Sequence, residues 1–420
     1  MTAPASAIPA PRPDKAPPRR AWGRLGWIAP RVAAAWLLLD LGLRFVPLTW
    51  FPLRDFQIAR RWFPLHSPFT PNLRIDSSYF EGDEALEGNL PPTESRTPTR
   101  FTTDSLGFRS TPAVHQGASP EVLVFRGFSF TWGAGLSDEE VLPVALAREL
   151  GVNVYDAARF HEDPELPADV DRLLARLGAR PRTAVYVHLE PNGHTLDWNR
   201  PKAIDRMGIA MLGESRYTPI KQFADYAQLV VATWFRVSPL NIFCVRLYKS
   251  ISNDRLLPNV YRRDVAEFRL PDGRPFLARR TDMERVESRV PEDVLRARAE
   301  YISWWRDQLA ARGIQMTVLL VPEKMSVYGP AMGRPVQANP FLNRLERELL
   351  SHGVKVVNGL PLLSREAPAE LAAGRLFYFR EDHHWNAHGV ARLSRAVAEA
   401  LRSSDPALYR GKSGESEVSE

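Results

Sequence analysis

Short apolar runs alternate with amphipathic stretches along the chain from Glu121 onward. The runs have the length of buried strands, and the stretches between them place apolar residues at helical spacing. This pattern predicts strands at 121–126, 152–156, 183–189, 316–321 and 354–358, and helices at 137–150, 167–177, 291–311, 341–350 and 386–401. Strands that alternate with helices indicate an α/β fold, a doubly wound parallel sheet with helices on both faces.

Three segments interrupt or flank this alternation. Residues from about 195 to 288 are predicted to form a mostly helical insertion in the α/β domain, which otherwise spans residues 121–405. Within the insertion, residues 270–274 contain the Asp-Gly pair that is typical of a turn between two short strands. Residues 53–120 are interpreted as an extended lead-in, and residues 406–420 as a disordered tail.

The longest apolar segment, residues 27–52, lies near the N-terminus. As a helix rising about 1.5 Å per residue, it is long enough to cross about 30 Å of hydrocarbon. Asp40 and Arg44 interrupt it, but their spacing lets them pair on one helix face. We interpret it as a membrane anchor helix; the alternative is an amphipathic helix that lies on a bilayer or caps the domain. A later apolar run, 229–247, contains two arginines and a proline, which favours a buried or membrane-contacting helix over a second membrane span.

Charge is concentrated in the first residues. The 420 residues carry a formal net charge of +6, and residues 1–31 contain six basic residues and one acidic residue. Residues 1–26 are therefore interpreted as a disordered basic tail. Basic residues before an apolar segment predict a cytoplasmic N-terminus, a single pass through a bacterial inner membrane and a periplasmic catalytic domain. Because the rest of the chain is nearly neutral, no nucleic-acid partner is expected. The lone Cys244 excludes an internal disulfide and cysteine-rich zinc sites.

The first candidate for chemistry is Ser129, in the loop 127–135 that follows the first strand of the body. Glycines bracket this loop, which places the serine in a tight connection from strand to helix. A hydroxyl there lies beside free backbone N–H groups, as a nucleophile requires if an oxyanion is to form next to it. The alternative is a plain glycine-rich loop in which the serine caps a helix.

A second cluster, residues 381–389, stands just before the last predicted helix. Asp382 and His384 are two positions apart, so in an extended segment they project to the same side and the carboxylate can orient the imidazole. The alternatives are a surface histidine cluster and a metal site. Zinc needs a further well-placed ligand that the sequence does not supply, so we predict neither a metal nor a cofactor.

Together, these two segments resemble the motifs of a known family. Gly-x-Ser-Phe-x-Trp-Gly at 127–133 and Asp-x-His-Trp-Asn-x-x-Gly at 382–389 are similar to motifs of the SGNH (GDSL-like) hydrolase superfamily, and within it of the alginate O-acetyltransferase-like branch. The stretch FTTDSLGFR at 101–109 resembles that branch's lead-in, and VPEKMSVY at 321–328 resembles its proline-lysine-tyrosine segment. The resemblance covers residues from about 100 to 400, apart from the insertion.

The resemblance implies roles for individual residues. Ser129 matches the nucleophile, His384 the general base, and Asp382 the carboxylate that holds the histidine tautomer. Four further side chains are candidates for lining a substrate groove: Trp132, Trp385, Lys324 and Tyr328. The alternative is that the two tryptophans belong to the core and that the lysine and the tyrosine lie in a loop packed at the end of a strand.

The oxyanion donors implied by the resemblance are the backbone N–H groups of Ser129 and Ala157 and the side-chain amide of Asn192. Two positions depart from the family pattern: Phe128 stands where an aspartate is expected before the serine, and the glycine expected after the second strand is absent.

Together, the resemblance and the predicted anchor imply a membrane-anchored, extracytoplasmic O-acyltransferase, which forms an acyl-enzyme and passes an acyl group, in particular acetyl, to a polysaccharide. It also implies a multi-pass membrane acyltransferase as the partner that delivers the acyl group. One alternative is a carbohydrate or lipid esterase with the same triad. Another is a catalytically weak glycan-binding member of such a complex, which Phe128 and the missing glycine favour.

Overall fold

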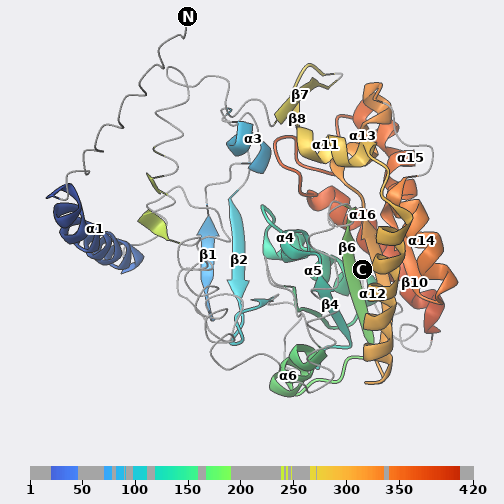
Figure 1. The fold of residues 1–420 in the computed structure, drawn as a ribbon. Coiled ribbons are helices and arrows are strands. Elements are labelled where there is room, and N and C mark those ends of the chain that lie inside the picture. Colours follow the sequence, from blue (N-terminus) through green and yellow to red (C-terminus); the bar gives the residue numbers. More distant parts are fainter. Residues whose placement is uncertain are drawn as a thin grey trace, which may run out of the picture.

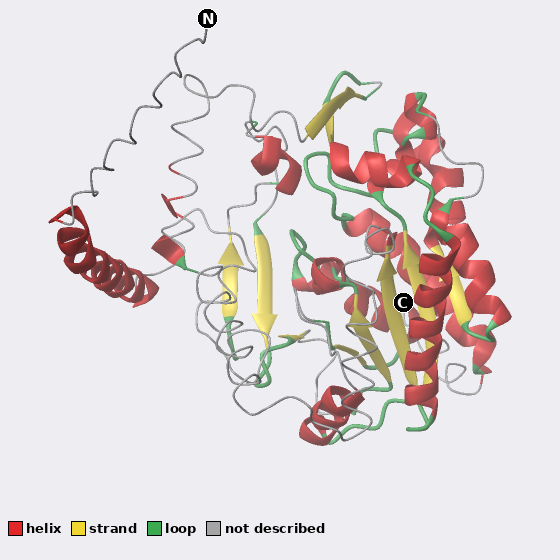
Figure 2. Cartoon of the chain, in the orientation of Figure 1, coloured by secondary structure: helices red, strands yellow, loops and turns green. Residues whose placement is uncertain are grey.

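The computed structural model describes residues 20–45, 71–77, 82–88, 90, 98–110, 119–158, 167–190, 238–240, 243–244, 247, 265–270, 272–334 and 340–406. Asn192, most of the predicted insertion and the C-terminal tail lie outside these residues. In Figures 1 and 2, the strands of the main sheet lie between two groups of helices.

The main sheet has five parallel strands in the order β10-β9-β6-β4-β5. Most of their residues are apolar, as expected for strands covered on both faces. This confirms the predicted parallel sheet. Because β5 lies on one side of β4 and β6 on the other, the strand order reverses at β4, which is where open α/β sheets place their sites. The strands are β4 (Val122–Arg126), β5 (Val154–Asp156), β6 (Thr183–Leu189), β9 (Gln315–Val321) and β10 (Lys355–Asn358).

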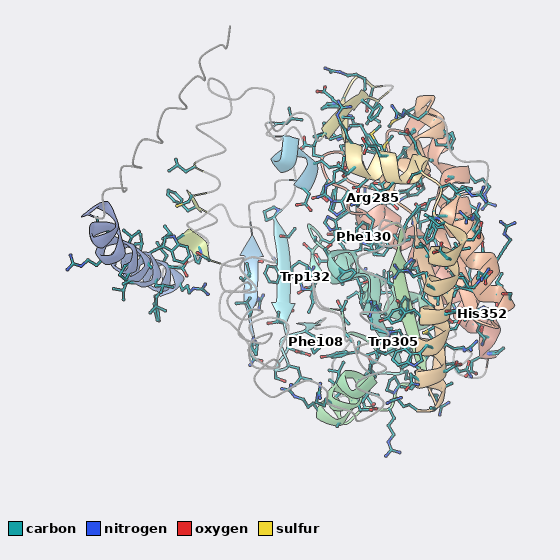
Figure 3. All side chains as sticks on the ribbon, viewed as in Figure 1. Phe108, Phe130, Trp132, Arg285, Trp305 and His352 are labelled. Atoms are coloured by element: carbon teal, nitrogen blue, oxygen red, sulfur yellow. The ribbon has the colours of Figure 1, made fainter. Side chains whose placement is uncertain are left out.

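Helices cover both faces of this sheet, and each turns an apolar stripe to it. On one face α5 packs against α16, and on the other α12 packs against α14 and α6. Trp305, which Figure 3 labels on α12, contacts Phe125 of β4, with ring centroids 5.5 Å apart. The helices are α5 (Leu142–Leu150), α6 (Pro167–Leu177), α12 (Glu292–Ala310), α14 (Phe341–Ser351), α15 (Gly359–Ala372) and α16 (Ala387–Ser404).

Two helices differ from the sequence pattern. The helix predicted from residue 137 begins as a 3-10 turn, Asp138–Glu140, and α5 follows from Leu142 because Pro143 fits only the first turn of a helix. The pattern also missed α15, whose Pro361 and Pro368 made a helix improbable on propensity alone. Its Asn358 cap and its buried apolar face stabilise it nevertheless.

The lead-in contains more structure than the extended segment that was predicted. It forms an antiparallel sheet in the order β1-β2-β3 and a short helix, α3. In Figure 1, α3 lies near the hairpin of β7 and β8, which it contacts. The elements are β1 (Arg74–Ser77), α3 (Asp83–Gly88), β2 (Thr99–Thr103) and β3 (Arg109–Ser110).

The described end of the insertion is a hairpin followed by a helix. Strands β7 (Val265–Arg269) and β8 (Pro275–Arg279) are antiparallel and enclose the predicted turn, where Gly273 has a φ of 78°. Helix α11 (Arg280–Glu287) leads from the hairpin back to α12.

Helix α1 (Arg20–Phe45) begins within the segment interpreted as a disordered tail and covers most of the predicted anchor. Arg44 pairs with Asp40 as predicted, with Nε 3.0 Å from Oδ2, and both side chains are fully buried. Asp40 also accepts from the Ser238 hydroxyl at 2.6 Å. Among the described helices, none combines the length and the apolar character that a membrane crossing requires. The anchor therefore stays a prediction.

Candidate functional site

The turn between β4 and α4 (Phe128–Trp132) brings Ser129 to the carboxyl edge of the sheet. Three successive residues, Arg126, Gly127 and Phe128, have positive φ values of 65°, 79° and 49°. For a non-glycine residue this left-handed region costs about 1–2 kcal/mol, and such strain concentrates at functional sites. Phe128, at the family's aspartate position, thus forms part of a sharp turn that leaves Ser129 half-buried.

The histidine comes from the loop that precedes α16. Nε2 of His384 lies 2.6 Å from Oγ of Ser129, and Nδ1 lies 2.5 Å from Oδ1 of Asp382. The same Oδ1 accepts from the backbone N–H of His384 at 2.9 Å. A carboxylate at Nδ1 keeps the proton on that nitrogen and leaves Nε2 able to accept the serine proton. The structure thus brings the three predicted residues together in the order of a Ser-His-Asp triad.

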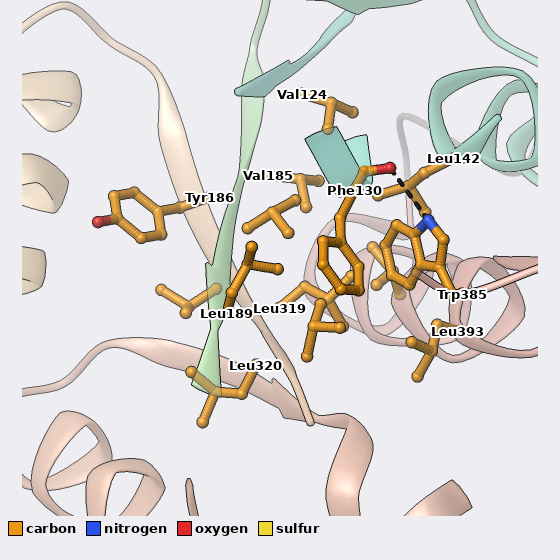
Figure 4. Close-up of a cluster of buried hydrophobic side chains, with 14 of the residues drawn as sticks. Val124, Phe130, Leu142, Val185, Tyr186, Leu189, Leu319, Leu320, Trp385 and Leu393 are labelled. Carbon is orange, nitrogen blue, oxygen red and sulfur yellow. Dashed lines mark hydrogen bonds between the residues drawn. The ribbon is translucent and has the colours of Figure 1, made fainter. Parts of the chain in front are cut away.

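An aromatic core lies directly beneath these residues. The ring of Phe130 packs against His384, with centroids 4.8 Å apart, and its carbonyl oxygen accepts from Nε1 of Trp385 at 3.0 Å (Figure 4). Figure 4 also shows apolar side chains of the sheet, such as Val185 and Leu319, around Phe130. The serine turn and the histidine loop are therefore packed on one rigid core.

The predicted groove residues do not face solvent. Trp132, Lys324 and Tyr328 are fully buried, and Trp385 is 1% exposed. Lys324 pairs with a buried glutamate, and the hydroxyl of Tyr328 accepts from the Phe377 N–H at 2.6 Å. The prediction that these four side chains line a substrate groove is wrong, because each already packs or bonds within the protein interior.

The structure describes two of the three predicted oxyanion donors, Ser129 and Ala157. Ser129 is the second residue of α4, in the first turn, where backbone N–H groups have no partner within the helix. The N–H of Ala157 instead donates to the carbonyl of Val124 at 2.8 Å, so the prediction for Ala157 is wrong. Asn192 lies outside the described residues, and its role stays a prediction.

Arg109, the last residue of the lead-in motif, supports the far end of α4. Its guanidinium donates to Asp138 at 3.0 Å and to the carbonyls of Trp132, Gly133 and Leu136 at 2.7, 2.8 and 2.5 Å. It also lies over the Trp132 ring, 4.9 Å from the centroid. The sequence pattern marked this motif only by resemblance and did not indicate what the arginine binds.

The sequence pattern also missed two acidic residues that follow central strands of the sheet. Glu190 and Glu323 follow β6 and β9, and Oε2 of Glu190 accepts from the Glu323 N–H at 2.8 Å. Burial raises the pKa of Glu190 to about 7, and burial likewise raises the pKa of Glu323. Their place after two central strands was the only sequence signal available.

A metal ion is the main chemical alternative at this site. Asp83, Asp382, His383 and His384 each place one ligand atom within 4.8 Å of the others. However, both ring nitrogens of His384 already make short hydrogen bonds, to Asp382 and Ser129. A cation held by this set would have to break one of them, so the geometry favours the triad.

Comparison with known proteins identifies a family for the C-terminal part of the chain. No curated protein matches the chain. A family model does match residues 280–418, which contain Asp382 and His384 but not Ser129. The model is that of the SGNH hydrolase-like domain of the acetyltransferase AlgX, and this C-terminal part of the chain thereby confirms the resemblance predicted from the motifs.

Proposed function

We propose that this protein is a serine O-acyltransferase that transfers an acyl group, in particular acetyl, to a hydroxyl group of a polysaccharide. The observation that carries the proposal is the 2.6 Å contact between Ser129 and His384, with Asp382 on the other ring nitrogen. The matched family model supports acetyltransferase or esterase chemistry on such a substrate.

The reaction would proceed in two halves. In the first, Oγ of Ser129 attacks the acyl carbonyl carbon and its proton passes to Nε2 of His384. The tetrahedral intermediate collapses, the leaving oxygen takes that proton, and an ester on Ser129 remains. In the second, His384 removes the proton of a sugar hydroxyl, whose oxygen attacks the ester carbonyl; the bond to Oγ of Ser129 breaks and Oγ takes the proton back from His384.

Charge that develops in these steps needs stabilisation from fixed donors. The backbone N–H of Ser129 is one oxyanion donor in this proposal, and the side-chain amide of Asn192 is the second. Asp382 stabilises the imidazolium that forms at His384 and does not itself accept the proton.

An esterase would use the same first half and differ only in its acceptor, which would be water. Both enzymes require the same triad contacts, so the products of the reaction must distinguish them. The compact triad geometry favours either enzyme over a binding protein that lacks catalysis.

The test is to incubate the purified full-length chain with a chromogenic acetyl ester, with and without an oligosaccharide. Acetylated oligosaccharide supports the transferase, and free acetate alone supports the esterase. If the wild-type chain shows no turnover beyond that of Ser129→Ala, the chain is a binding protein and the proposed chemistry is wrong.

We further propose that α1 anchors the protein in a bacterial inner membrane, with the catalytic domain in the periplasm. Apolar side chains on several sides of α1 are exposed, while its Asp40 and Arg44 are buried and paired. A buried ion pair lowers the energy needed to place these charges in lipid. The exposed apolar residues are Ile28, Val32, Leu37, Leu38, Leu39, Leu41 and Phe45.

A reporter enzyme that is active only in the periplasm, fused after residue 60, tests this topology. An active fusion supports it, and an inactive one contradicts it. The multi-pass acyltransferase that would supply the acyl group is also a proposal. It predicts that such a protein is co-purified with the full chain from detergent-solubilised membranes.

A further inference from the structure

The ammonium group of Lys324 joins segments that meet behind the triad. Its Nζ donates to the carbonyl oxygens of Leu277 at 2.6 Å, Arg380 at 3.0 Å and Asp382 at 3.2 Å. It also pairs with Oε2 of Glu84 at 2.7 Å, and both side chains of this pair are fully buried. Burial raises the pKa of Glu84 to about 7, although attraction to Lys324 opposes the rise. A lysine with four acceptors and no exposed surface is held in one position.

The first turn of α3 holds the other side of the same loop. The N–H of Asp83 donates at 3.0 Å to Oδ2 of Asp382, the carboxylate oxygen that does not face His384. The next two N–H groups of α3, those of Glu84 and Ala85, donate to the Glu381 carbonyl at 3.1 and 3.2 Å. First-turn N–H groups have no partners within a helix, so they can bind acceptors outside it.

We propose that Lys324 and Glu84 are positioning residues for the triad, which hold Asp382 so that its Oδ1 faces Nδ1 of His384. This inference rests on the proposed function, because it concerns the same site. Lys324 acts on this loop through the carbonyl oxygens of Arg380 and Asp382. Glu84 acts through Lys324 and through the turn of α3. A displacement of about 1 Å at an active site can lower a rate about 10²-fold.

The test compares kcat, KM and a spectroscopic signal in the full-length chain. Lys324→Met is expected to lower kcat for acetyl-ester hydrolysis about 10- to 100-fold and to leave KM within about twofold. In the proton NMR spectrum, the low-field resonance of the Nδ1 proton between His384 and Asp382 should shift or broaden. Glu84→Gln, which keeps an acceptor for Lys324, should retain most of the activity that Glu84→Ala loses.

Arg344→Met is the matched control. Arg344 is also a buried cation, and it donates to the carbonyl of Val290 at 2.9 Å and to Glu292 at 2.6 Å, away from the triad. Its loss should lower the melting temperature but leave kcat and the resonance unchanged. If Arg344→Met lowers kcat as much as Lys324→Met does, or if Lys324→Met changes neither kcat nor the resonance, the proposal is wrong.

A second variant separates positioning from stability. Lys324→Met leaves the buried Glu84 carboxylate without its cation, and Lys324→Met/Glu84→Leu removes that unpaired charge, so the double variant should melt at a higher temperature than the single variant. Its kcat should stay as low as that of Lys324→Met, and recovery of kcat would contradict the proposal. If the wild type has no turnover, the resonance still tests the inference, provided that Asp382→Asn abolishes it.

Discussion

Oγ of Ser129 lies 2.6 Å from Nε2 of His384, although 255 positions separate the two residues in the sequence. Each residue is held by its own set of contacts. The serine turn is fixed by left-handed backbone at 126–128 and by Arg109 at the end of α4. The histidine loop is fixed by Asp382. The core around Phe130 joins the two.

Ser129→Ala should abolish acyl-enzyme formation without unfolding the protein, because it removes a single oxygen from a half-buried side chain. We expect ester turnover to fall at least about 10³-fold. Asp382→Asn should lower kcat about 10²- to 10⁴-fold through the wrong histidine tautomer. Mass spectrometry of the chain after incubation with an ester checks the covalent intermediate. An acyl group found on Ser129→Ala would rule out this nucleophile.

Gly127→Ala should both destabilise the fold and reduce activity. The added Cβ would lie 2.6 Å from Cγ1 of Val187 and 2.2 Å from Oγ1 of Thr131, in a backbone with a φ of 79°. Strain and overpacking together should cost about 3 kcal/mol. Gly313→Ala is the control, since its φ is 74° but a Cβ there meets no atom within 4 Å. It should cost about 1 kcal/mol and leave kcat unchanged. Equal losses for the two variants would refute the steric argument.

Arg109→Met should lower the free energy of unfolding by about 3–5 kcal/mol, because it leaves buried Asp138 and three carbonyls without their charged partner. Chemical denaturation measures this change. Arg392→Met removes a partly exposed pair with Glu366 and should cost less than about 1 kcal/mol. A small effect at Arg109 would show that the lead-in does not stabilise the end of α4.

Glu190→Gln should change how stability depends on pH. Burial raises the pKa of Glu190 from 4.5 to about 7, so the folded state holds this proton more tightly than the unfolded state does. The corresponding stability is fully present below pH 4.5 and is lost as the pH rises through 7. The variant should match the wild type near pH 4.5 and exceed it by about 3 kcal/mol at pH 8.

Glu366→Gln should change the pH dependence of stability in the opposite direction. A hydrogen bond from Arg392 lowers the pKa of Glu366, so its contribution is present at neutral pH and is lost as the pH falls through the lowered value. The glutamine variant should be less stable than the wild type at pH 7 and equal to it in strong acid. If Glu190→Gln shows no gain at pH 8, the glutamate is not desolvated as the structure indicates.

The parallel sheet and the three triad residues could be predicted because local signals determine them. Apolar runs mark the strands, and the spacing of Asp382 and His384 places both on one side of an extended segment. The surroundings could not be predicted, because they depend on which atoms meet in three dimensions. Trp132 and Trp385 are of a residue type that is suited to stacking on sugar rings, but tertiary packing buries both side chains. The Ala157 N–H donates to the Val124 carbonyl, and no local pattern in the sequence identifies this acceptor.

The lead-in shows the same limit. Helix α3 has six residues, and nothing in its sequence indicates that its first turn binds a loop about 300 positions later. The resemblance marked Lys324 for the wrong reason, as a groove residue. Its ammonium group is instead bound by backbone carbonyl oxygens. Every residue carries such an oxygen, so the sequence does not indicate which of them will contact the lysine.

The strand order also constrains how the protein is made. Strands β6 and β9 are neighbours, but the ribosome must add residues 190 to 314 before β9 exists to pair with β6. At 5–20 residues per second this takes about ten seconds. During that time the growing chain carries Ser129 without His384. Under the proposed function, an interrupted chain would therefore have the nucleophile without the residue that activates it, and incomplete synthesis would release no active hydrolase of acyl donors.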